Sequence, residues 1–289
     1  SLNQRSAEGQ RFALSGVEPL EGFRDVEGTD IIVFYPVHGV SPMQKLQMDT
    51  QKGGNVNVCA INGNFDDAQT GVKKIFTDRA VKEKLRAAGM EFSSANSINW
   101  GRLVPQIVYY VSSYCELLKN GEDLKNGFNV VVPTGNFGNI LAAYYAKCMG
   151  VPIAKLVCAS NANNVLTDFI NTGVYDKNRD FYTTTSPSMD ILISSNLERM
   201  LYHLYGNDAK ATLELQKKLA DKGRFEVSGD VLADLKDLYF GGCCDDKGTL
   251  DTIKDVYSKY GYLLDTHTAV AVSVQREYDK KPETKETPE

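Results

Sequence analysis

The residues with the clearest chemical potential lie between Phe128 and Asn139, where the sequence reads FNVVVPTGNFGN. An apolar run typical of a strand ends in a proline, and a Gly-Asn-Phe-Gly-Asn turn leads into an apolar, helix-like stretch. Two glycines three residues apart allow backbone N–H groups to converge on one point, and the start of a helix adds partial positive charge. This pattern predicts a phosphate site built from Gly135, Asn136, Phe137, Gly138 and Asn139. The alternative is an ordinary strand-to-helix turn whose glycines relieve steric crowding.

The turn does not match the better-known phosphate-binding loops. It lacks the Lys-Ser/Thr ending of a P-loop and the third glycine of a dinucleotide-binding loop. We therefore expect the phosphate of a different kind of ligand.

Strands and helices alternate around this turn. Short apolar runs predict strands over residues 31–36, 55–61, 129–133 and 153–159, the first of them buried on both faces. Alternation of this kind is typical of parallel sheets with crossover helices, so the sequence predicts an α/β fold.

The helices are expected where apolar residues recur at helical spacing. This spacing predicts helices over 42–53, 65–75, 103–118, 140–149 and within 161–173, and the helix over 103–118 is expected to be mostly buried. From Asp190 onward the pattern is strongly helical and includes a helix over 231–242.

Composition and charge exclude several classes of protein. The net charge is −5 and no basic stripe with interleaved aromatic residues occurs, so nucleic acid is not an expected partner. No apolar run approaches the roughly 18 residues that a membrane-spanning helix needs. Cys243 and Cys244 are adjacent without CxxC spacing, and the chain has three histidines, so we expect no metal site. The six cysteines are interpreted as free thiols of a cytoplasmic protein.

Seven motifs, several of them rich in polar residues, extend the signal of the turn along the chain. They are YPVHGVSPMQKLQM (35–48), GNFDDAQTGVKKIF (63–76), SANSINWGRLVPQIVYY (94–110), VVPTGNFGN (131–139), ASNANNVLTDF (159–169), TTTSPSMDILISSNLER (183–199) and DTHTAVAV (265–272). Together they resemble threonine synthase, in the branch found in fungi and many bacteria. The resemblance is nearly continuous from about residue 20 to residue 274, so we expect a version that is truncated at both ends.

The resemblance implies a fold, a cofactor and a reaction. The implied fold is that of the tryptophan-synthase-β-like (fold type II) enzymes that use pyridoxal 5′-phosphate (PLP), with parallel sheets flanked by helices and part of the small domain missing. A threonine synthase is a lyase of threonine biosynthesis that converts O-phospho-L-homoserine and water into L-threonine and phosphate. The implied partner is a small phosphorylated amino acid, and both a monomer and a homodimer are compatible with the sequence.

The resemblance also implies an order of domains. These are an unmatched leader (1–19), a remnant of the smaller α/β domain (20–90), a large cofactor-binding α/β domain (91–279) with a helical insertion at about 190–262, and a charged tail (280–289).

Individual residues take roles from the same resemblance. In this family the GNFGN loop holds the cofactor phosphate, a role that we carry to residues 135–139. The SANSIN segment resembles the part of the fold that faces the substrate, which implies candidate substrate-binding roles for Asn96, Ser97, Asn99 and Arg102. The alternative for Asn96 and Ser97 is that they cap the helix that follows.

Other polar residues have two open interpretations. Ser186, Ser188 and Asp190 lie in a polar loop that either borders the cleft or is solvated. His267 either contacts the site or belongs to a helix cap, and we favour the cap. His38 and His203 are expected to be surface or packing residues.

Two family motifs do not occur in this sequence. They are the Phe-Lys-Asp motif, whose lysine forms a Schiff base with PLP, and a Ser-Gly-Asp-Thr-Gly turn. Lys45, Lys52, Lys73 and Lys74 have polar neighbours, whereas an apolar pocket is needed to lower a lysine pKa for such chemistry. We therefore assign no catalytic residue and expect a polypeptide of this sequence to be inactive.

Two alternatives to a threonine synthase are considered. A non-catalytic fragment or derived protein would keep the fold and bind phosphate or a partner. A sister enzyme, such as a serine or threonine dehydratase or a cysteine synthase, is disfavoured because those enzymes usually carry a glycine-rich tetrad where this chain has Asn and Phe between its glycines.

Overall fold

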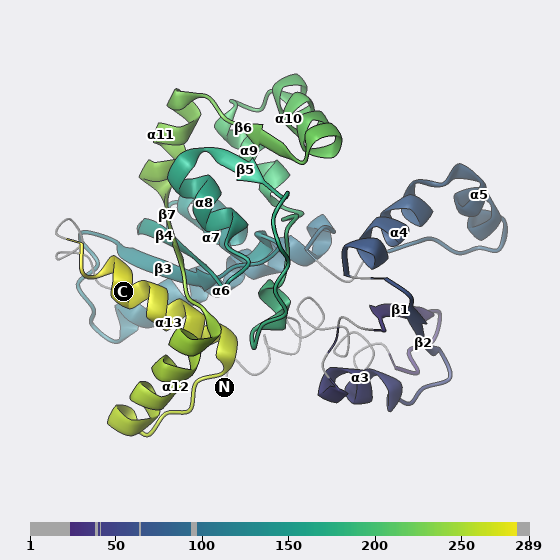
Figure 1. The fold of residues 1–289 in the computed structure, drawn as a ribbon, viewed down its shortest axis with the longest axis horizontal. Helices are drawn as coiled ribbons and strands as arrows, with labels where there is room; N and C mark the ends of the chain where they lie inside the picture. The colour runs from purple at the N-terminus through teal and green to yellow at the C-terminus, as the bar shows by residue number, and fades with distance from the viewer. Residues whose placement is uncertain (1–23, 38–39, 41, 64, 94–96, 282–289) are drawn as a thin grey trace. The chain divides into compact units, whose positions relative to one another are not determined.

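The computed structural model describes residues 24–37, 40, 42–63, 65–93 and 97–281, and Figure 1 shows their helices and strands. The chain divides into two compact units, one that ends at Arg102 and one that begins at Leu103. The domain limits predicted from the sequence, including the boundary between residues 90 and 91, stay a prediction.

The first unit contains two strands and three helices in the described ranges. In chain order these are β1 (Ile31–Pro36), α3 (Pro42–Asp49), β2 (Val56–Ile61), α4 (Phe65–Thr77) and α5 (Arg79–Ala87). The predicted strand–helix–strand–helix order is confirmed, although α3 ends four residues earlier than the predicted limit of residue 53.

β1 and β2 pair in parallel. The register runs from Ile31 opposite Val56 to Pro36 opposite Ile61, as a crossover through a helix requires. Ile32 and Phe34 are exposed, so the prediction that this strand is buried on both faces is wrong. The continuous apolar run hides an alternation in which every second side chain of Ile31–Phe34 lies outward.

The second unit carries most of the helices and three parallel strands. Its elements are α6 (Trp100–Lys119, which begins before Leu103), β3 (Phe128–Pro133), α7 (Gly138–Cys148), β4 (Ile153–Ser160), α8 (Val165–Thr172), β5 (Val174–Asp176), a 3₁₀ turn η1 (Pro187–Met189), α9 (Leu197–Leu204), α10 (Ala209–Lys222), β6 (Arg224–Glu226), α11 (Gly229–Leu238), β7 (Tyr239–Cys243), α12 (Asp246–Tyr260) and α13 (Thr266–Tyr278).

The sheet of this unit has the strand order β3-β4-β7, and both pairings are parallel. Its two faces bury separate apolar clusters. One cluster joins Leu156 and Cys158 of β4 to α7 and α8, and the other joins Val157 and Ala159 to α13. Figure 1 shows α7 and α8 on one face of the sheet and α13 on the other. Neighbouring residues of β4 therefore serve opposite cores, as the period of two of a strand requires.

β7 corrects the sequence-based prediction of a helix over residues 231–242. The helix α11 ends at Leu238, and the next five residues pair with β4 from Leu156 opposite Tyr239 to Ser160 opposite Cys243. Gly242 is needed in this strand because a Cβ there would lie 2.6 Å from Cγ1 of Val274 on α13. The glycines thus allow close packing of a helix on the strand.

α6 corrects a second prediction, that of a mostly buried helix. One side buries Leu103, Gln106 and Tyr110, whereas Val108 is 62% exposed. The helix packs through one stripe only, although its apolar residues surround most of its circumference.

Candidate functional site

The loop between β3 and α7 has the geometry of a strand-to-helix turn. Thr134 continues the sheet, because its N–H donates to the carbonyl of Ala159 at 2.8 Å. Phe137 adopts the left-handed conformation (φ 61°), which a bulky residue seldom occupies. Its ring is 1% exposed and lies 5.5 Å from the ring of Tyr239, so core packing holds the strained backbone in place. The side chain of Phe137 thus packs in the core beneath the turn.

The backbone carbonyls of the loop are hydrogen-bonded to a distant segment, residues 194–196. Ser194 Oγ donates to the carbonyl of Gly135 at 2.9 Å, and the backbone N–H and Nδ2 of Asn196 donate to the carbonyl of Asn136 at 3.0 and 2.9 Å. Ser195 Oγ donates to Oδ1 of Asn136 at 3.3 Å. These contacts fix the orientation of the peptide groups that join residues 135 to 137.

The backbone N–H groups of the loop, unlike its carbonyls, have no hydrogen-bond partner among the described residues. Among the hydrogen bonds of the described residues, none uses the N–H of Asn136, Phe137, Gly138 or Asn139 as its donor. The first intrahelical bond of α7 runs from Leu141 N–H to the carbonyl of Phe137 at 3.1 Å. Consecutive N–H groups at the start of an eleven-residue helix remain available for an anion.

The side chain of Asn139 belongs to the packing of the loop on α6. Tyr110 Oη donates to Oδ1 of Asn139 at 2.5 Å, and Nδ2 of Asn139 donates to Oε1 of Gln106 at 3.2 Å. These contacts fix the first turn of α7, so any contribution of Asn139 to a phosphate comes from its backbone.

Gly135 is required for close approach to another loop. A Cβ at this position would lie 2.7 Å from the carbonyl oxygen of Ser188 and 3.3 Å from Cα of Met189. Both contacts involve backbone atoms, which move only together with the loop around them. The absence of a side chain at Gly135 therefore allows the backbone of residues 188–189 to pack against the loop.

The loop of residues 183–190 is held by a buried carboxylate. Asp190 is 8% exposed and accepts hydrogen bonds from Nδ2 of Asn161 at 2.7 Å, Nδ2 of Asn163 at 2.9 Å, and Oγ1 and the backbone N–H of Thr184 at 2.8 and 2.9 Å. Ser186 is also buried. The interpretation of Ser186 and Asp190 as part of a solvated loop is therefore wrong, and a place beside a cleft stays a prediction.

His267 connects the same loop to α13. Asp265 caps the helix by accepting from the N–H groups of His267 and Thr268 at 2.9 and 3.1 Å. The side chain of His267 accepts from the N–H of Ser188 through Nε2 at 3.2 Å. The favoured cap is present, with Asp265 as its acceptor, and the imidazole has a second task in holding Ser188.

Stability is expected to fall as the pH decreases below about 6.5 because of His267. Burial lowers the pKa of His267 below its ordinary value, although Asp265 and Asp190 nearby act in the opposite direction. The folded state thus favours the neutral ring, whose contribution is complete above the unfolded pKa of about 6.5 and is lost as the pH falls below it. Denaturant midpoints measured from pH 7 downward should decrease less for His267→Gln than for the unmodified chain, because glutamine does not titrate. The amide oxygen of the glutamine can still accept from the N–H of Ser188. Equal decreases in both proteins would contradict the assignment.

The candidate substrate residues lie in the first unit, and the loop lies in the second. Asn96 is outside the described residues. Oδ1 of Asn99 accepts from the N–H of Gly101 at 3.0 Å, so Asn99 caps the start of α6. The alternative of a capping role for Asn96 falls outside the described residues, and that for Ser97 stays open. The substrate-binding roles of Ser97, Asn99 and Arg102 stay predictions.

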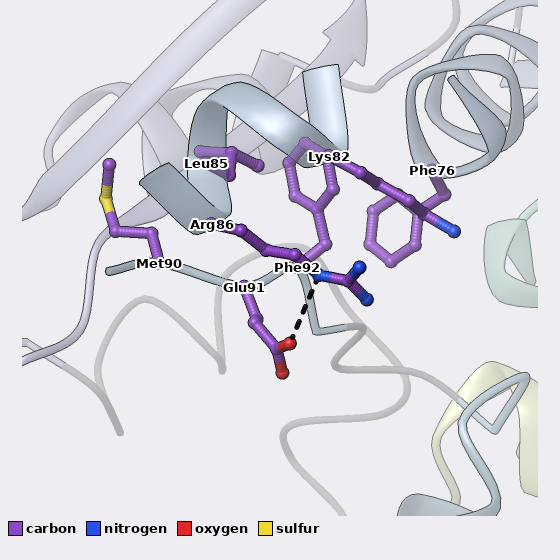
Figure 2. Close-up of a pocket in the computed structure, with 7 residues that line it drawn as sticks. All are labelled: Phe76, Lys82, Leu85, Arg86, Met90, Glu91 and Phe92. Carbon is purple, nitrogen blue, oxygen red and sulfur yellow. Dashed lines mark ion pairs between the residues drawn. The ribbon is translucent and has the colours of Figure 1, made fainter. Parts of the chain in front are cut away.

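The first unit also contains a cavity of about 220 Å³ beside α4 and α5. The rings of Phe76 and Phe92 line it and stack with their centroids 4.8 Å apart. Figure 2 shows the ion pair between Arg86 and Glu91, in which Nε and Oε1 are 3.7 Å apart. Lys82, Leu85 and Met90 complete the lining. The cavity includes none of the predicted site residues.

The described ranges contain neither a metal-ligand cluster nor a membrane-spanning helix. No cluster of three or more His, Cys, Asp or Glu side chains there is placed to hold a metal ion. No helix in that part of the chain combines the length and apolar character needed to cross a membrane.

Comparison with known proteins identifies the relatives of the chain. No family model matches it. Human threonine synthase-like 1 is 42% identical over 275 residues, which cover 92% of this chain and 37% of that protein. Threonine synthase of Pseudomonas aeruginosa is 38% identical over 263 residues, which cover 91% of this chain and 54% of that enzyme. The chain is a homologue of the threonine synthases. It spans about half the length of the threonine synthases it matches.

A solved structure supports the same conclusion. The crystal structure of PLP-bound threonine synthase from Brucella melitensis has a TM-score of 0.77 and 40% sequence identity, and the match covers 91% of this chain and 54% of that one. The fold is that of the type II PLP enzymes, with parallel sheets flanked by helices, and the fold predicted from the sequence is confirmed.

Sequence reasoning missed the residues that orient the loop. Ser194, Ser195 and Asn196 received no role, although they lie inside the motif of residues 183–199 that resembles the family. Their polar, closely spaced side chains were the available signal, but only the fold brings them to residues 135 and 136.

Proposed function

We propose that residues 135–139 bind the phosphate of PLP and that the chain supplies the cofactor-phosphate site of a threonine synthase-type enzyme. The observation that carries the proposal is the row of N–H groups from Asn136 to Asn139 without acceptors in the described part of the chain. Homology to threonine synthases, one of them solved with PLP bound, supports the choice of ligand.

The residues present fit a phosphate dianion. Charge-assisted hydrogen bonds from several backbone N–H groups stabilise such a group without a lysine, and the start of α7 adds partial positive charge. The loop side chains Asn136 and Asn139 are neutral, and burial raises the pKa of the neighbouring Cys158 thiol to about 12, so no thiolate repels the ligand. When bound, PLP supplies an electron sink for reactions of amino acids.

The residues packed around the loop orient it for ligand binding. Ser194 and Asn196 hold the loop carbonyls, so the N–H groups are oriented before a ligand arrives. Phe137 fixes the turn through core packing. We propose that these residues position the cofactor through its phosphate, and that Asn96, Ser97, Asn99 and Arg102 bind the phosphorylated substrate.

The proposed reaction of the whole enzyme is conversion of O-phospho-L-homoserine and water into L-threonine and phosphate. A non-catalytic, phosphate-binding protein of the same fold is the second candidate. It is favoured by one observation, namely that Lys45, Lys52 and Lys74 are exposed, whereas an apolar pocket is needed to lower a lysine pKa for Schiff-base chemistry.

Calorimetric titration of the chain with deoxypyridoxine phosphate tests the proposed site. This PLP analogue lacks the aldehyde, so it reports binding without lysine chemistry. We expect deoxypyridoxine without the phosphate to bind at least about 100-fold more weakly, because it loses several charge-assisted hydrogen bonds. Equal affinities for the two compounds would show that the loop does not bind the phosphate.

Borohydride reduction with PLP separates the two candidate functions. After reduction, intact mass should show no specific covalent adduct on the 289-residue chain, because Lys45, Lys52, Lys73 and Lys74 have polar neighbours in the sequence rather than an apolar pocket. A single modified lysine that deoxypyridoxine phosphate protects would favour the catalytic candidate for this polypeptide.

A further inference from the structure

Ser160, the last residue of β4, carries a hydroxyl that the fold does not use. The residue is 1% exposed, and its Oγ has no hydrogen-bond partner among the described residues. Buried hydroxyls are nearly always paired, because leaving one unpaired costs free energy. An unpaired buried hydroxyl therefore indicates a hydrogen-bond partner that a bound ligand would supply.

The register of the sheet places Ser160 at the base of the candidate loop. Val132 and Pro133 lie opposite Cys158 and Ala159, and the N–H of Thr134 donates to the carbonyl of Ala159 at 2.8 Å. The next position along β4, Ser160, is thus the lateral neighbour of Thr134, which immediately precedes Gly135.

The alternation of β4 gives the direction of the side chain. Leu156 and Cys158 face the core cluster that contains Phe137 and Ile140, whereas Val157 and Ala159 face α13. Ser160 follows Cys158 by two residues, so its hydroxyl lies on the face of the sheet that carries the loop and α7. Ligands of parallel α/β sheets bind beyond the carboxyl ends of the strands, which is where Ser160 stands.

We propose that the Ser160 hydroxyl donates a hydrogen bond to the phosphate bound by the N–H groups of residues 136–139. This inference rests on the proposed function and adds a side-chain ligand to a site otherwise built from backbone. A serine hydroxyl is a suitable donor because it adds no charge and rotates to meet an oxygen. In the bound state the phosphate oxygens would accept hydrogen bonds both from the Ser160 hydroxyl and from the N–H groups of the loop.

The test is Ser160→Ala in the full chain, followed by calorimetry with deoxypyridoxine phosphate and with inorganic phosphate. We expect about tenfold weaker binding of both ligands, because one charge-assisted hydrogen bond is lost. Without ligand, the melting temperature should be unchanged or slightly higher, since the substitution removes a buried group that had no partner. Affinity thus falls without any loss of stability, which a purely structural serine would not produce.

Asn129 supplies the matched control. It is a second buried polar side chain (5% exposed) whose Oδ1 and Nδ2 have no partner in the described structure, but it lies near the amino end of β3, at the far end of the sheet. Asn129→Leu should leave both affinities unchanged. Ser160→Cys, which keeps the size of the side chain with a weaker donor, should give an intermediate affinity.

The outcomes distinguish this inference from the proposed function. If the unmodified chain binds neither ligand, the proposed function fails and the inference fails with it. If the unmodified chain binds both and Ser160→Ala binds them equally well, only the inference fails. Weaker binding of deoxypyridoxine phosphate with unchanged binding of inorganic phosphate would also overturn it, because the contact would then lie away from the phosphate.

Discussion

Replacement of Asn136 by aspartate is expected to weaken the binding of deoxypyridoxine phosphate by about 100-fold. The substitution keeps the shape of the side chain, and the hydroxyl of Ser195 can still donate to its oxygen. It adds a negative charge to the loop that receives a dianion. Repulsion between charges a few ångströms apart near a protein surface amounts to a few kcal/mol, which corresponds to this loss of affinity.

The control for this prediction is Asn207→Asp, which adds the same charge in the turn after α9. Asn207 is exposed, and its Oδ1 lies 3.0 Å from Nδ1 of His203. This variant should bind the ligand as the unmodified chain does. Gly135→Asp is a poorer test, because its Cβ alone would collide with the backbone of Ser188 and disturb the loop without any charge effect. If Asn136→Asp retained full affinity, no dianion would be bound by this loop.

Replacement of Asp190 by alanine is expected to lower the free energy of unfolding by about 3 kcal/mol or more. The buried carboxylate accepts from Asn161, Asn163 and Thr184, and its loss leaves these donors without their acceptor. Hydrogen bonds to a charged group contribute more than neutral ones, and unpaired buried groups add a further cost. Urea denaturation measures the change.

Asp246→Ala is the matched control for Asp190. Asp246 also accepts two hydrogen bonds from the same loop, from the N–H and Oγ1 of Thr185 at 3.0 and 2.9 Å, but these contacts are exposed. We expect a loss of about 1 kcal/mol or less from this substitution. A loss of unfolding free energy in Asp190→Ala as small as that in Asp246→Ala would show that the buried network does not hold the loop.

Ligand affinity should also fall in Asp190→Ala, because residues 188–189 pack against Gly135.

Local sequence patterns predicted the elements that are defined by neighbouring residues. The strand 129–133, the turn and the helix that follows are recognisable because an apolar run, two glycines and a helical pattern stand next to one another. β7 was missed for the opposite reason. Tyr239 to Cys243 follow a helix directly and include two glycines, so only their pairing with β4 reveals a strand.

The same limit applies to the site. The glycine spacing predicted the turn, but the contacts that orient it come from residues about 60 positions later, such as Asn196 at the carbonyl of Asn136. Spacing in the sequence carries no information on such contacts. Likewise, Ser160 is an unremarkable serine in the sequence, and its lack of a partner appears only when the sheet and the core are formed.

Binding of one phosphate by the amides after Gly135 can be observed directly. The most direct measurement is an amide NMR titration of the ¹⁵N-labelled chain with deoxypyridoxine phosphate. We expect saturable shifts of the N–H resonances of Asn136, Phe137, Gly138 and Asn139, while those of Gly206 and Gly261 in remote turns stay unchanged. Loop resonances that do not move at saturating ligand would show that these amides do not bind the phosphate.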